Sequence, residues 1–443
     1  MRVNIHTRRV PGLLALGLTL LVAGCQTTAP IRSDVGDSTG PATAPAMGPE
    51  AGDGPPQSTA TVGPAGDPVD ANAPARGEIH DVATPDVARP AGLPEATADS
   101  NTMVAHFIDV GQGDAILLEF SCAAMLIDTG GEDTARVSGK DRLQTYLEEF
   151  FERRSDLART LQSVVLSHPH ADHTGGVSVL LDAEPAVVIM NVLDGGPPGS
   201  HASGGKGQRD LEAYAADTTG VGYMGIAESD IKTVSGATNA VIDPINCRRG
   251  GVGVDPKISA LWGRADLDVA WANNANNDSV VLRVAFGKSV FLFTGDIQAE
   301  AIAAMLESYS ADRRAFNADV LKIAHHGSHN ATTADLVAAV TPKIAVIQSG
   351  DSSPDDERFS AYAFGHPNVT ALTNLLDPDN GITLARDHPK QVRVGNKGRH
   401  PTNRTPPDFT YWTMDKAIYA NGWDGNIAIT ATSDGVLSVE TEY

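Results

Sequence analysis

The sequence lacks a hydrophobic run long enough for a comfortable membrane-spanning helix, because the stretch from Leu13 to Val22 is too short. Transport through a membrane channel is therefore not a predicted function. Basic residues are also scarce, since 33 Lys and Arg stand against 55 Asp and Glu and give a formal net charge of −22. This balance favours solubility and opposes tight, non-specific binding to a polyanion, although a local basic patch or bound metal ions can reverse the sign at a site.

Cysteine is scarce as well, with 3 residues in 443. Cys25 ends the stretch LVAGC after a basic start and an apolar centre, which predicts a bacterial lipoprotein signal peptide over residues 1–25. We expect a lipid on Cys25 and, because Gln26 rather than Asp follows it, an outer-membrane location in the cell envelope. An ordinary secretory signal is the alternative. Cys122 and Cys247 could form a disulfide in an exported protein, but their spacing alone leaves this open.

Aromatic residues make up 5% of the sequence and are almost absent from its first hundred residues. Residues 26–102 consist mainly of Pro, Ala, Gly, Thr, Ser and Asp, so they cannot bury enough apolar area to offset their ordering entropy. They predict a disordered tether with an r.m.s. span of roughly 50 Å. Residues 103–443 are long enough for one large domain, and the Gly-rich stretch at about 195–264 predicts an insertion in it.

Apolar periodicity in residues 103–443 predicts alternating strands and helices, and therefore a mixed α/β class. The segment 103–120 contains two apolar runs joined by GQGD, a hairpin signal, and 122–131 adds a short strand. Residues 141–161 have the spacing of an amphipathic helix. A buried strand, SVVLS, follows, and further strands and helices alternate until a terminal hairpin within residues 417–441.

The stretch LSHPHADHTGG places four metal-seeking side chains directly after that buried strand. In an extended chain, residues two apart point to the same side, so His168 and His170 can grip one ion together. Asp172 and His173 lie where the chain turns toward a helix and can face a neighbouring position. Imidazole and carboxylate ligands without thiolate suit zinc, manganese or iron. The sequence therefore predicts a metal site here.

These residues carry a resemblance to a known family. HPHADH resembles the signature of the metallo-β-lactamase superfamily, whose fold is a four-layer αββα sandwich with one or two metal ions. Seven segments in order are similar to the C-terminal domain of the ComEC family of DNA-uptake proteins and its stand-alone relatives: HFIDVGQGDAILLEF, LIDTG, SHPHADHTGG, NNDSVVLRV, FLFTGD, LKIAHHGS and FGHP. The resemblance implies this fold, a metal-dependent hydrolase, and two divalent ions, with zinc or manganese expected.

The resemblance also implies roles for individual residues. His168 and His170 would bind the first metal, while Asp172 and His173 would bind the second. Asp172 would also help orient the attacking nucleophile, which makes it the expected catalytic residue. Asp296, in TGD, would bridge the two ions, although an Asp at this place is also a good helix N-cap.

The HHG element supplies the remaining expected ligand. Its alignment favours His326 for the second metal, with His325 as a rival that the sequence does not separate from it. Asp128 resembles an early structural aspartate that orients the histidine loop through hydrogen bonds, and such support tunes metal affinity. His366, in GHP, is expected to face a phosphate or act as an acid, or else to cap a loop.

Two positions depart from the family pattern. His170 stands where ComEC-type domains usually have Asp. The third first-site histidine of the wider superfamily is replaced by NNDS, so we expect Asn277 or its neighbours, Ser279 among them, to line the site. An amide oxygen is a weaker ligand than imidazole, and the first metal is therefore expected to be held less tightly.

The expected function is a lipid-anchored, extracytoplasmic hydrolase that uses a metal-bound hydroxide on a phosphoester, as a phosphodiesterase or nuclease. The possible substrates are a phosphoester or a nucleic acid, and the membrane is contacted through the lipid on Cys25. One alternative is a lactonase or β-lactamase-type hydrolase, against which the missing histidine counts. Another is a surface binding protein that keeps the fold without turnover. The sequence does not specify an oligomeric state.

Overall fold

The computed structural model describes residues 101–196, 205–248, 253–266, 269–399 and 405–443. The expected signal peptide (1–25), Cys25 and all but the last two residues of the expected tether (26–102) lie outside these ranges. Among the described residues, no helix is both long and apolar enough to cross a bilayer. The folded domain begins with its first strand at Thr102, close to the expected boundary.

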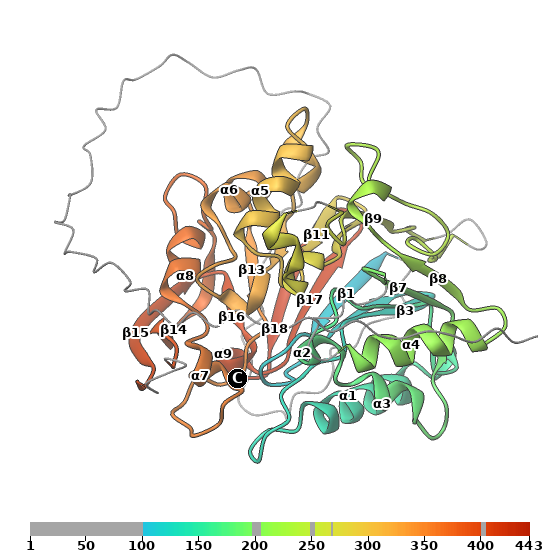
Figure 1. The fold of residues 1–443 in the computed structure, drawn as a ribbon, viewed down its shortest axis with the longest axis horizontal. Coiled ribbons are helices and arrows are strands. Elements are labelled where there is room, and N and C mark those ends of the chain that lie inside the picture. The colour runs from blue at the N-terminus through green and yellow to red at the C-terminus, as the bar shows by residue number, and fades with distance from the viewer. Residues whose placement is uncertain (1–100, 197–204, 249–252, 267–268, 400–404) are drawn as a thin grey trace, which may run out of the picture. The chain divides into compact units, whose positions relative to one another are not determined.

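Two mixed sheets form the centre of the domain (Figure 1). The first sheet has the strand order β18 (Leu437–Thr441), β17 (Ile427–Thr432), β1 (Thr102–Phe107), β2 (Ile116–Phe120), β3 (Ala123–Ile127), β5 (Ser163–Val165), β7 (Asn191–Asp194) and β8 (Gly222–Gly225). The second has the order β16 (Ile418–Ala420), β13 (Ile344–Ile347), β12 (Val320–Lys322), β11 (Ser289–Phe293), β10 (Val281–Phe286) and β9 (Lys257–Trp262). Each sheet joins an antiparallel half to a parallel half.

Smaller elements surround these sheets. The two-stranded pairs are β4 (Thr160–Leu161) with β6 (Val188–Ile189) and β14 (Ala385–Lys397) with β15 (Asp408–Lys416). The α-helices are α1 (Gly139–Arg153), α2 (Ala171–Thr174), α3 (Val177–Leu181), α4 (Lys206–Asp217), α5 (Ala299–Ser308), α6 (Ala334–Val340), α7 (Ala361–Phe364), α8 (Val369–Leu375) and α9 (Asn421–Asp424).

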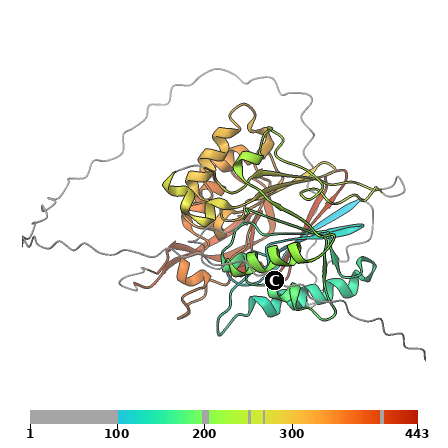
Figure 2. The same ribbon diagram turned by 45° about the vertical axis from the view of Figure 1, so that its right-hand side comes forward.

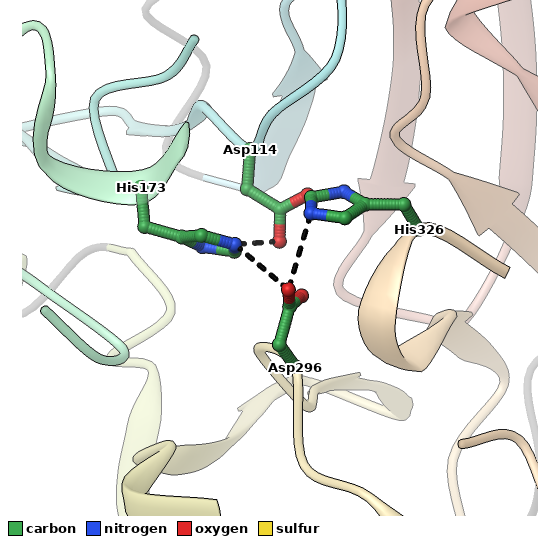
Figure 3. A group of neighbouring side chains, drawn as sticks. All are labelled: Asp114, His173, Asp296 and His326. Atoms are coloured by element: carbon green, nitrogen blue, oxygen red, sulfur yellow. Dashed lines mark ion pairs between the residues drawn. The ribbon is translucent and has the colours of Figure 1, made fainter. Parts of the chain in front are cut away.

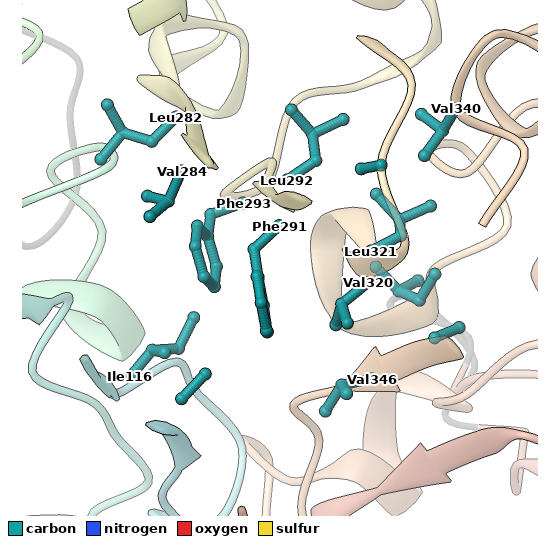
Figure 4. Close-up of a cluster of buried hydrophobic side chains, with 14 of the residues drawn as sticks. Ile116, Leu282, Val284, Phe291, Leu292, Phe293, Val320, Leu321, Val340 and Val346 are labelled. Atoms are coloured by element: carbon teal, nitrogen blue, oxygen red, sulfur yellow. The ribbon is translucent and has the colours of Figure 1, made fainter. Parts of the chain in front are cut away.

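Strand alternation divides the apolar side chains between two cores. On β11, Phe291 and Phe293 point into the space between the sheets, where Phe293 lies 6.3 Å from Phe107 between ring centroids. Figure 4 shows these rings among other side chains of the second sheet. On β2, Leu117 belongs instead to a core that includes Leu147 and Phe150 of α1. Helices thus cover the outer face of each sheet (Figure 2), which confirms the expected four-layer αββα sandwich.

Helix α1 shows how the sequence sets one outer layer. The side chain of Ser138 caps its first turn by accepting from the amide of Asp141, and its buried face recurs at helical spacing. The helix ends at Arg153, eight residues before the end of the expected helix 141–161. The next residue, Arg154, turns its guanidinium into ion pairs with Glu119 and Asp156, and the chain then enters β4.

The stretch expected to be an insertion, at about 195–264, supplies regular structure where it is described. It contains α4, which packs in the core with α1, together with β8 and β9, the edge strands of the two sheets. A disulfide joins Cys247 of this stretch to Cys122 in the β2–β3 turn, with 5.4 Å between their Cα atoms. The pairing that spacing left open is therefore present, and it closes a loop across 125 positions. Such a crosslink is worth about 5 kcal/mol in the chain-entropy picture.

Candidate metal centre

The candidate site lies where loops leave the carboxyl ends of neighbouring strands in both sheets. His173 follows β5, Asp296 follows β11 and His326 follows β12, while Asp114 lies in the loop between β1 and β2. Gly113 lets this last loop approach the histidine loop, because its φ is +152° and a Cβ there would lie 2.5 Å from the main-chain oxygen of Asp172. The amide of Asp114 then donates to that same oxygen at 3.0 Å.

Four buried side chains converge at this place: Asp114, His173, Asp296 and His326 (Figure 3). One ligand atom from each lies within 4.8 Å of all the others. The Nε2 atoms of His173 and His326 are each 3.1 Å from Oδ2 of Asp296. Among the described ranges, this is the one group of three or more His, Cys, Asp or Glu side chains that converges in this way. We refer to these four residues as the metal centre.

The donor atoms of the metal centre fit a divalent ion. His173 Nδ1 donates to Asp128 at 2.8 Å and His326 Nδ1 donates to the carbonyl oxygen of Gln348 at 2.7 Å, so both rings present Nε2 inward. Both Nε2 atoms and Oδ1 of Asp296 are buried without a hydrogen-bond partner, whereas the Asp114 carboxylate is ion-paired with a lysine, Lys322. Buried polar atoms rarely stay unpaired, and imidazole with carboxylate is a ligand set for zinc, manganese or iron.

The electrostatics agree with this fit. Burial lowers the pKa of His173, but Asp296 and Asp128 raise it well above its usual value. Burial also lowers the pKa of His326, which Asp296 and Asp114 raise well above its usual value. Conversely, burial raises the pKa of Asp296, and His173 and His326 hold it well below its usual value. The centre thus stabilises positive charge, which either protons on its imidazoles or a divalent ion can supply.

Two residues near the centre were missed by sequence reasoning. Asp114 stands in GQGD, which reads as a hairpin signal, yet it follows a buried strand just as the other acidic ligands do. Lys322 ends the apolar strand β12, and its ammonium is buried against Asp114, donates to the carbonyl of Gly295 at 2.9 Å and lies 3.7 Å from Asp296. The sequence held one signal for Lys322, which is a lysine within an apolar strand. A charge buried there needs a partner of opposite charge.

Asp128 holds the histidine loop in place. Its Oδ1 accepts from the amide of Ser167 and its Oδ2 from the Ser167 hydroxyl, both at 2.7 Å, and Oδ2 also accepts from His173. The residue has a φ of 57°, a left-handed conformation that costs about 1 kcal/mol or more for a residue with a Cβ. The structure therefore places Asp128 behind a ligand rather than among the converging atoms.

The expected first-metal pair lies beside the centre. His168 Nε2 and His170 Nδ1 are 3.0 Å apart, and the rings of His168 and His173 have centroids 4.1 Å apart. Burial lowers the pKa of both His168 and His170, which favours the neutral form that binds metals. Asp172 approaches from the open side, with Oδ2 3.3 Å from His326 Nε2 and 15% of its side chain exposed. A first metal on His168 and His170 stays a prediction.

The HHG element separates its two histidines in space. His326 joins the metal centre, whereas His325 Nε2 lies 3.9 Å from Asp296 and its Nδ1 lies 3.1 Å from Oδ1 of Asn330. His325 and His326 have φ values of 51° and 53°, so two consecutive left-handed residues turn their rings apart. Burial lowers the pKa of His325, whose side chain is 21% exposed. His325 therefore lies at the rim.

The NNDS segment lines the site through a neighbour of Asn277. Asn277 donates to the carbonyl of Trp271 at 2.9 Å and accepts from the amide of Gln298 at 3.0 Å, so its amide is used within the fold. Asn276 instead reaches His325, with 3.4 Å between Nδ2 and Nε2, and its buried Oδ1 has no partner. Ser279 accepts from the amide of Asp296 at 2.9 Å and positions that loop.

His366 closes the site on the side of α7. Its Nδ1 lies 3.2 Å from the side-chain nitrogen Nε2 of Gln112, and its ring centroid is 6.0 Å from His325 and 6.1 Å from His326. Burial lowers the pKa of His366 well below its usual value, so the ring is neutral. A neutral imidazole bonded through one nitrogen keeps the other for a ligand.

Comparison with known proteins finds similarity over the part of the chain that carries these residues. The family model described as the metallo-beta-lactamase superfamily matches residues 108–351, more than half of the chain. The chain is 27% identical over 264 residues to Recombination protein 2 of Haemophilus influenzae, which covers 59% of this chain and 25% of that protein. It is 24% identical over 311 residues to ComE operon protein 3 of Bacillus subtilis, which covers 68% of this chain and 34% of that protein. The chain thus spans between a quarter and about a third of these relatives.

The metallo-beta-lactamase fold protein YhfI from Bacillus subtilis aligns at a TM-score of 0.31 and 14% identity. The alignment covers 55% of this chain and 85% of that chain.

Proposed function

The chain belongs to the metallo-beta-lactamase superfamily, and we propose that it is a metal-dependent hydrolase of phosphoesters, a phosphodiesterase or nuclease. The observation that carries this proposal is the convergence of ligand atoms from Asp114, His173, Asp296 and His326, among which both Nε2 atoms and Oδ1 of Asp296 have no hydrogen-bond partner. Two buried carboxylates are costly unless cations offset their charge, and Lys322 offsets only part of it, which supports a bound ion. Asp172, His170 and His325 are the partly exposed groups around it, so a substrate enters on their side.

A divalent ion bound here supplies Lewis acidity toward a phosphoryl oxygen and acidifies a water ligand. The chain's own groups do the rest. Asp128 and the Gln348 carbonyl fix the two imidazoles with Nε2 inward, and Lys322 offsets part of the carboxylate charge. Asp172 is the ionised acceptor on the open side, since His326 and His173 hold its pKa below the usual value although burial raises it. It can accept a hydrogen bond from an incoming nucleophile.

Two observations favour a phosphoester over a lactam or lactone. Asn276 and Asn277 stand where the wider superfamily has a first-site histidine, and the Asn277 amide is occupied within the fold. In addition, the curated relatives include one named Recombination protein 2, a name that points to nucleic acid. The lipid anchor at Cys25 and the outer-membrane location are part of the same proposal, which places the hydrolase in the cell envelope.

The test uses the full chain. Bound metal is measured by inductively coupled plasma mass spectrometry, and turnover is then followed with bis-p-nitrophenyl phosphate, single-stranded DNA, nitrocefin and a lactone. We expect metal-dependent phosphodiester cleavage that a chelator abolishes. Cleavage of nitrocefin or the lactone without any phosphodiester cleavage would replace this proposal, and binding without turnover of any substrate would favour a non-catalytic surface protein.

The anchor needs its own measurement. Cells that express the chain are labelled with a palmitate analogue and fractionated, and Cys25→Ser is the matched variant. We expect label and outer-membrane fractionation in the wild type and loss of both in the variant. A labelled protein that fractionates with the inner membrane would correct the location while leaving the anchor in place.

A further inference from the structure

An exposed group of rings surrounds one arginine on the β14–β15 hairpin. The group comprises Tyr362 and Phe364 of α7, Arg393 of β14, and Phe409 and Tyr411 of β15; we call these five residues the aromatic platform. The Arg393 Cζ lies 4.8 Å from the Phe409 ring centroid, 5.8 Å from that of Tyr362 and 6.0 Å from that of Tyr411. Tyr362 and Phe409 stack with centroids 5.5 Å apart and planes 11° apart.

The outer rings of the platform are exposed to solvent. Tyr411 is 72% exposed and Phe364 is 40% exposed, in a chain with few aromatic residues. The other face of the same hairpin is the one that packs, since Val392 and Val394 are buried in the main core. Among the described residues, Arg393 forms no ion pair with a carboxylate. The contacts of its guanidinium are with the faces of aromatic rings. Stabilising the hairpin therefore explains Val392 and Val394 but not Tyr411.

The charge of the hairpin runs against that of the chain. Its described residues, 385–399 and 405–416, include six Lys or Arg and three Asp, whereas the whole chain has 33 basic and 55 acidic residues. Arg386 and Lys390 are bound to Asp424 at the base of the hairpin. The remaining basic residues are Arg393, Lys397, Arg399 and Lys416. A locally basic, ring-bearing surface suits a ligand with both phosphates and flat faces.

The platform is continuous with the metal centre. Phe364 lies 5.6 Å from His366 between ring centroids, and His366 lies 6.1 Å from His326. Main-chain bonds tie the hairpin to the same segment, since Gly395 donates to Pro367 at 2.8 Å and Arg399 donates to Ala363 at 2.7 Å. In Figure 1 the hairpin lies beside α7 and α8. A bound strand can therefore run from Tyr411 past Phe364 toward the metal centre.

We propose that the aromatic platform binds single-stranded nucleic acid, with bases stacked on Tyr411 and Phe364 and the backbone directed past Arg393 to the metal centre. This inference rests on the proposed phosphodiesterase function and narrows its substrate class. A single strand is favoured over a duplex because only unpaired bases expose their faces to a protein ring. The acidic remainder of the chain confines polyanion binding to this surface.

The test measures binding by the full chain in the presence of a chelator, so that cleavage plays no part. Fluorescence anisotropy follows a labelled oligothymidylate at low salt, and a duplex of the same length and inorganic polyphosphate serve as competitors. We expect Tyr411→Ala and Arg393→Gln each to weaken oligothymidylate binding by about fivefold or more. Tyr411→Trp keeps a flat ring and is expected to retain the affinity. The duplex and polyphosphate are expected to compete poorly with the single strand.

Matched controls come from the same chain. Tyr443→Ala removes a tyrosine that is 71% exposed outside the platform, and Arg313→Gln removes an exposed charge before β12; both are expected to bind like the wild type. Unchanged affinity in Tyr411→Ala and Arg393→Gln, or competition by duplex as strong as by single strand, would overturn the platform. An equal loss for polyphosphate in Tyr411→Ala would also contradict stacking.

The two proposals fail separately. If bis-p-nitrophenyl phosphate is not cleaved but Tyr411→Ala still weakens oligothymidylate binding, the platform stands and the hydrolase proposal falls. If the diester is cleaved and the oligonucleotide binds independently of Tyr411 and Arg393, the hydrolase stands and the platform falls. Preferential binding of an unphosphorylated peptide or a vesicle at Tyr411 would assign the surface to another ligand and overturn the inference.

Discussion

Two buried groups of charged side chains in this domain resemble each other in composition and differ in one respect. On the outer face of the first sheet, Glu119 accepts from His106 Nε2 at 3.1 Å, from Arg153 at 2.8 Å and from Arg154 at 2.6 Å. Tyr146 lies 2.9 Å from the other nitrogen of His106. We call this group the α1 lock, because it joins β2 to the end of α1. Each carboxylate oxygen and each nitrogen of His106 has a partner.

The metal centre buries the same kinds of side chain but leaves inward-facing atoms of His173, Asp296 and His326 without hydrogen bonds. Burial of charge alone therefore does not distinguish a functional group from a structural one, because both groups are buried to a similar degree. The convergence of unpaired donors distinguishes them, since a fold satisfies a structural cluster and leaves a ligand site open. The two groups should respond oppositely to substitution.

The largest expected effect is on turnover in Asp296→Asn. A neutral amide is a poor ligand for a divalent ion, so bound metal and bis-p-nitrophenyl phosphate turnover should both fall, turnover by about a thousandfold or more. The free energy of unfolding of the metal-free protein should fall only modestly, because His173 and His326, which Asp296 helps to keep protonated, can release those protons when its charge is removed. Metal content, turnover and urea unfolding with a chelator measure these quantities. A large loss of metal-free stability would place Asp296 with structural groups like Glu119.

The converse substitution is Glu119→Gln in the α1 lock. Arg154 would then be buried opposite an amide, and we expect a loss of about 3 kcal/mol in the free energy of unfolding with or without metal. Metal content should stay at the wild-type level. Glu148→Gln, on the exposed face of α1, is the matched control and should change stability by less than about 0.5 kcal/mol. If Glu119→Gln lost metal without losing stability, the proposed difference between the α1 lock and the metal centre would be wrong.

The sequence predicted some residues of the metal centre and missed others, for physical reasons. His173 lies in the histidine loop, whose spacing after an apolar strand indicates ligands, whereas Asp296 and His326 were expected from the resemblance to the metallo-β-lactamase superfamily. Asp114 was hidden because GQGD serves equally well as a turn, and only the contact between its loop and the histidine loop gives it a ligand's position. Asn277 was expected at the site, but whether it or Asn276 faces inward depends on one rotation of a short 3₁₀ turn, Ala275–Asp278.

The central strands of the fold were predicted more completely than the edge strands and the helix ends. Short apolar runs bounded by turn signals identified the central strands β1, β2, β10 and β11, which are buried along most of their length. The edge strands β8 and β9 were read as an insertion, since edge strands bury less and their Gly-rich sequence has weak periodicity. The end of α1 was misplaced because Arg154 looks like an ordinary helical residue, and its pairing with Glu119 is set by tertiary structure.

A smaller effect is expected behind the ligands. Asp128→Asn keeps the shape of the residue but weakens its grip on His173 Nδ1 and on Ser167. Outer partners of this kind tune metal affinity, and we expect a tenfold to hundredfold weaker binding, about 1.4–2.7 kcal/mol. Competition with a coloured chelator measures the affinity. Wild-type affinity in Asp128→Asn would show that Ser167 and the loop backbone hold the imidazole without it.

The smallest expected effect is the pH response of the α1 lock. Burial raises the pKa of Glu119, but His106, Arg153 and Arg154 lower it from 4.5 to about 2. A depressed folded-state pKa gives stability that is present above the unfolded value and is lost as the pH falls from about 4.5 toward 2. The contribution of Glu119 should therefore shrink by about 1 kcal/mol between neutral pH and pH ~4.

Urea unfolding of the wild type and of Glu119→Gln, each with a chelator, isolates this contribution of Glu119, because the metal centre titrates equally in both proteins. The stability difference between the two proteins should narrow as the pH falls, and a constant difference would mean that the carboxylate of Glu119 gains nothing from its charge.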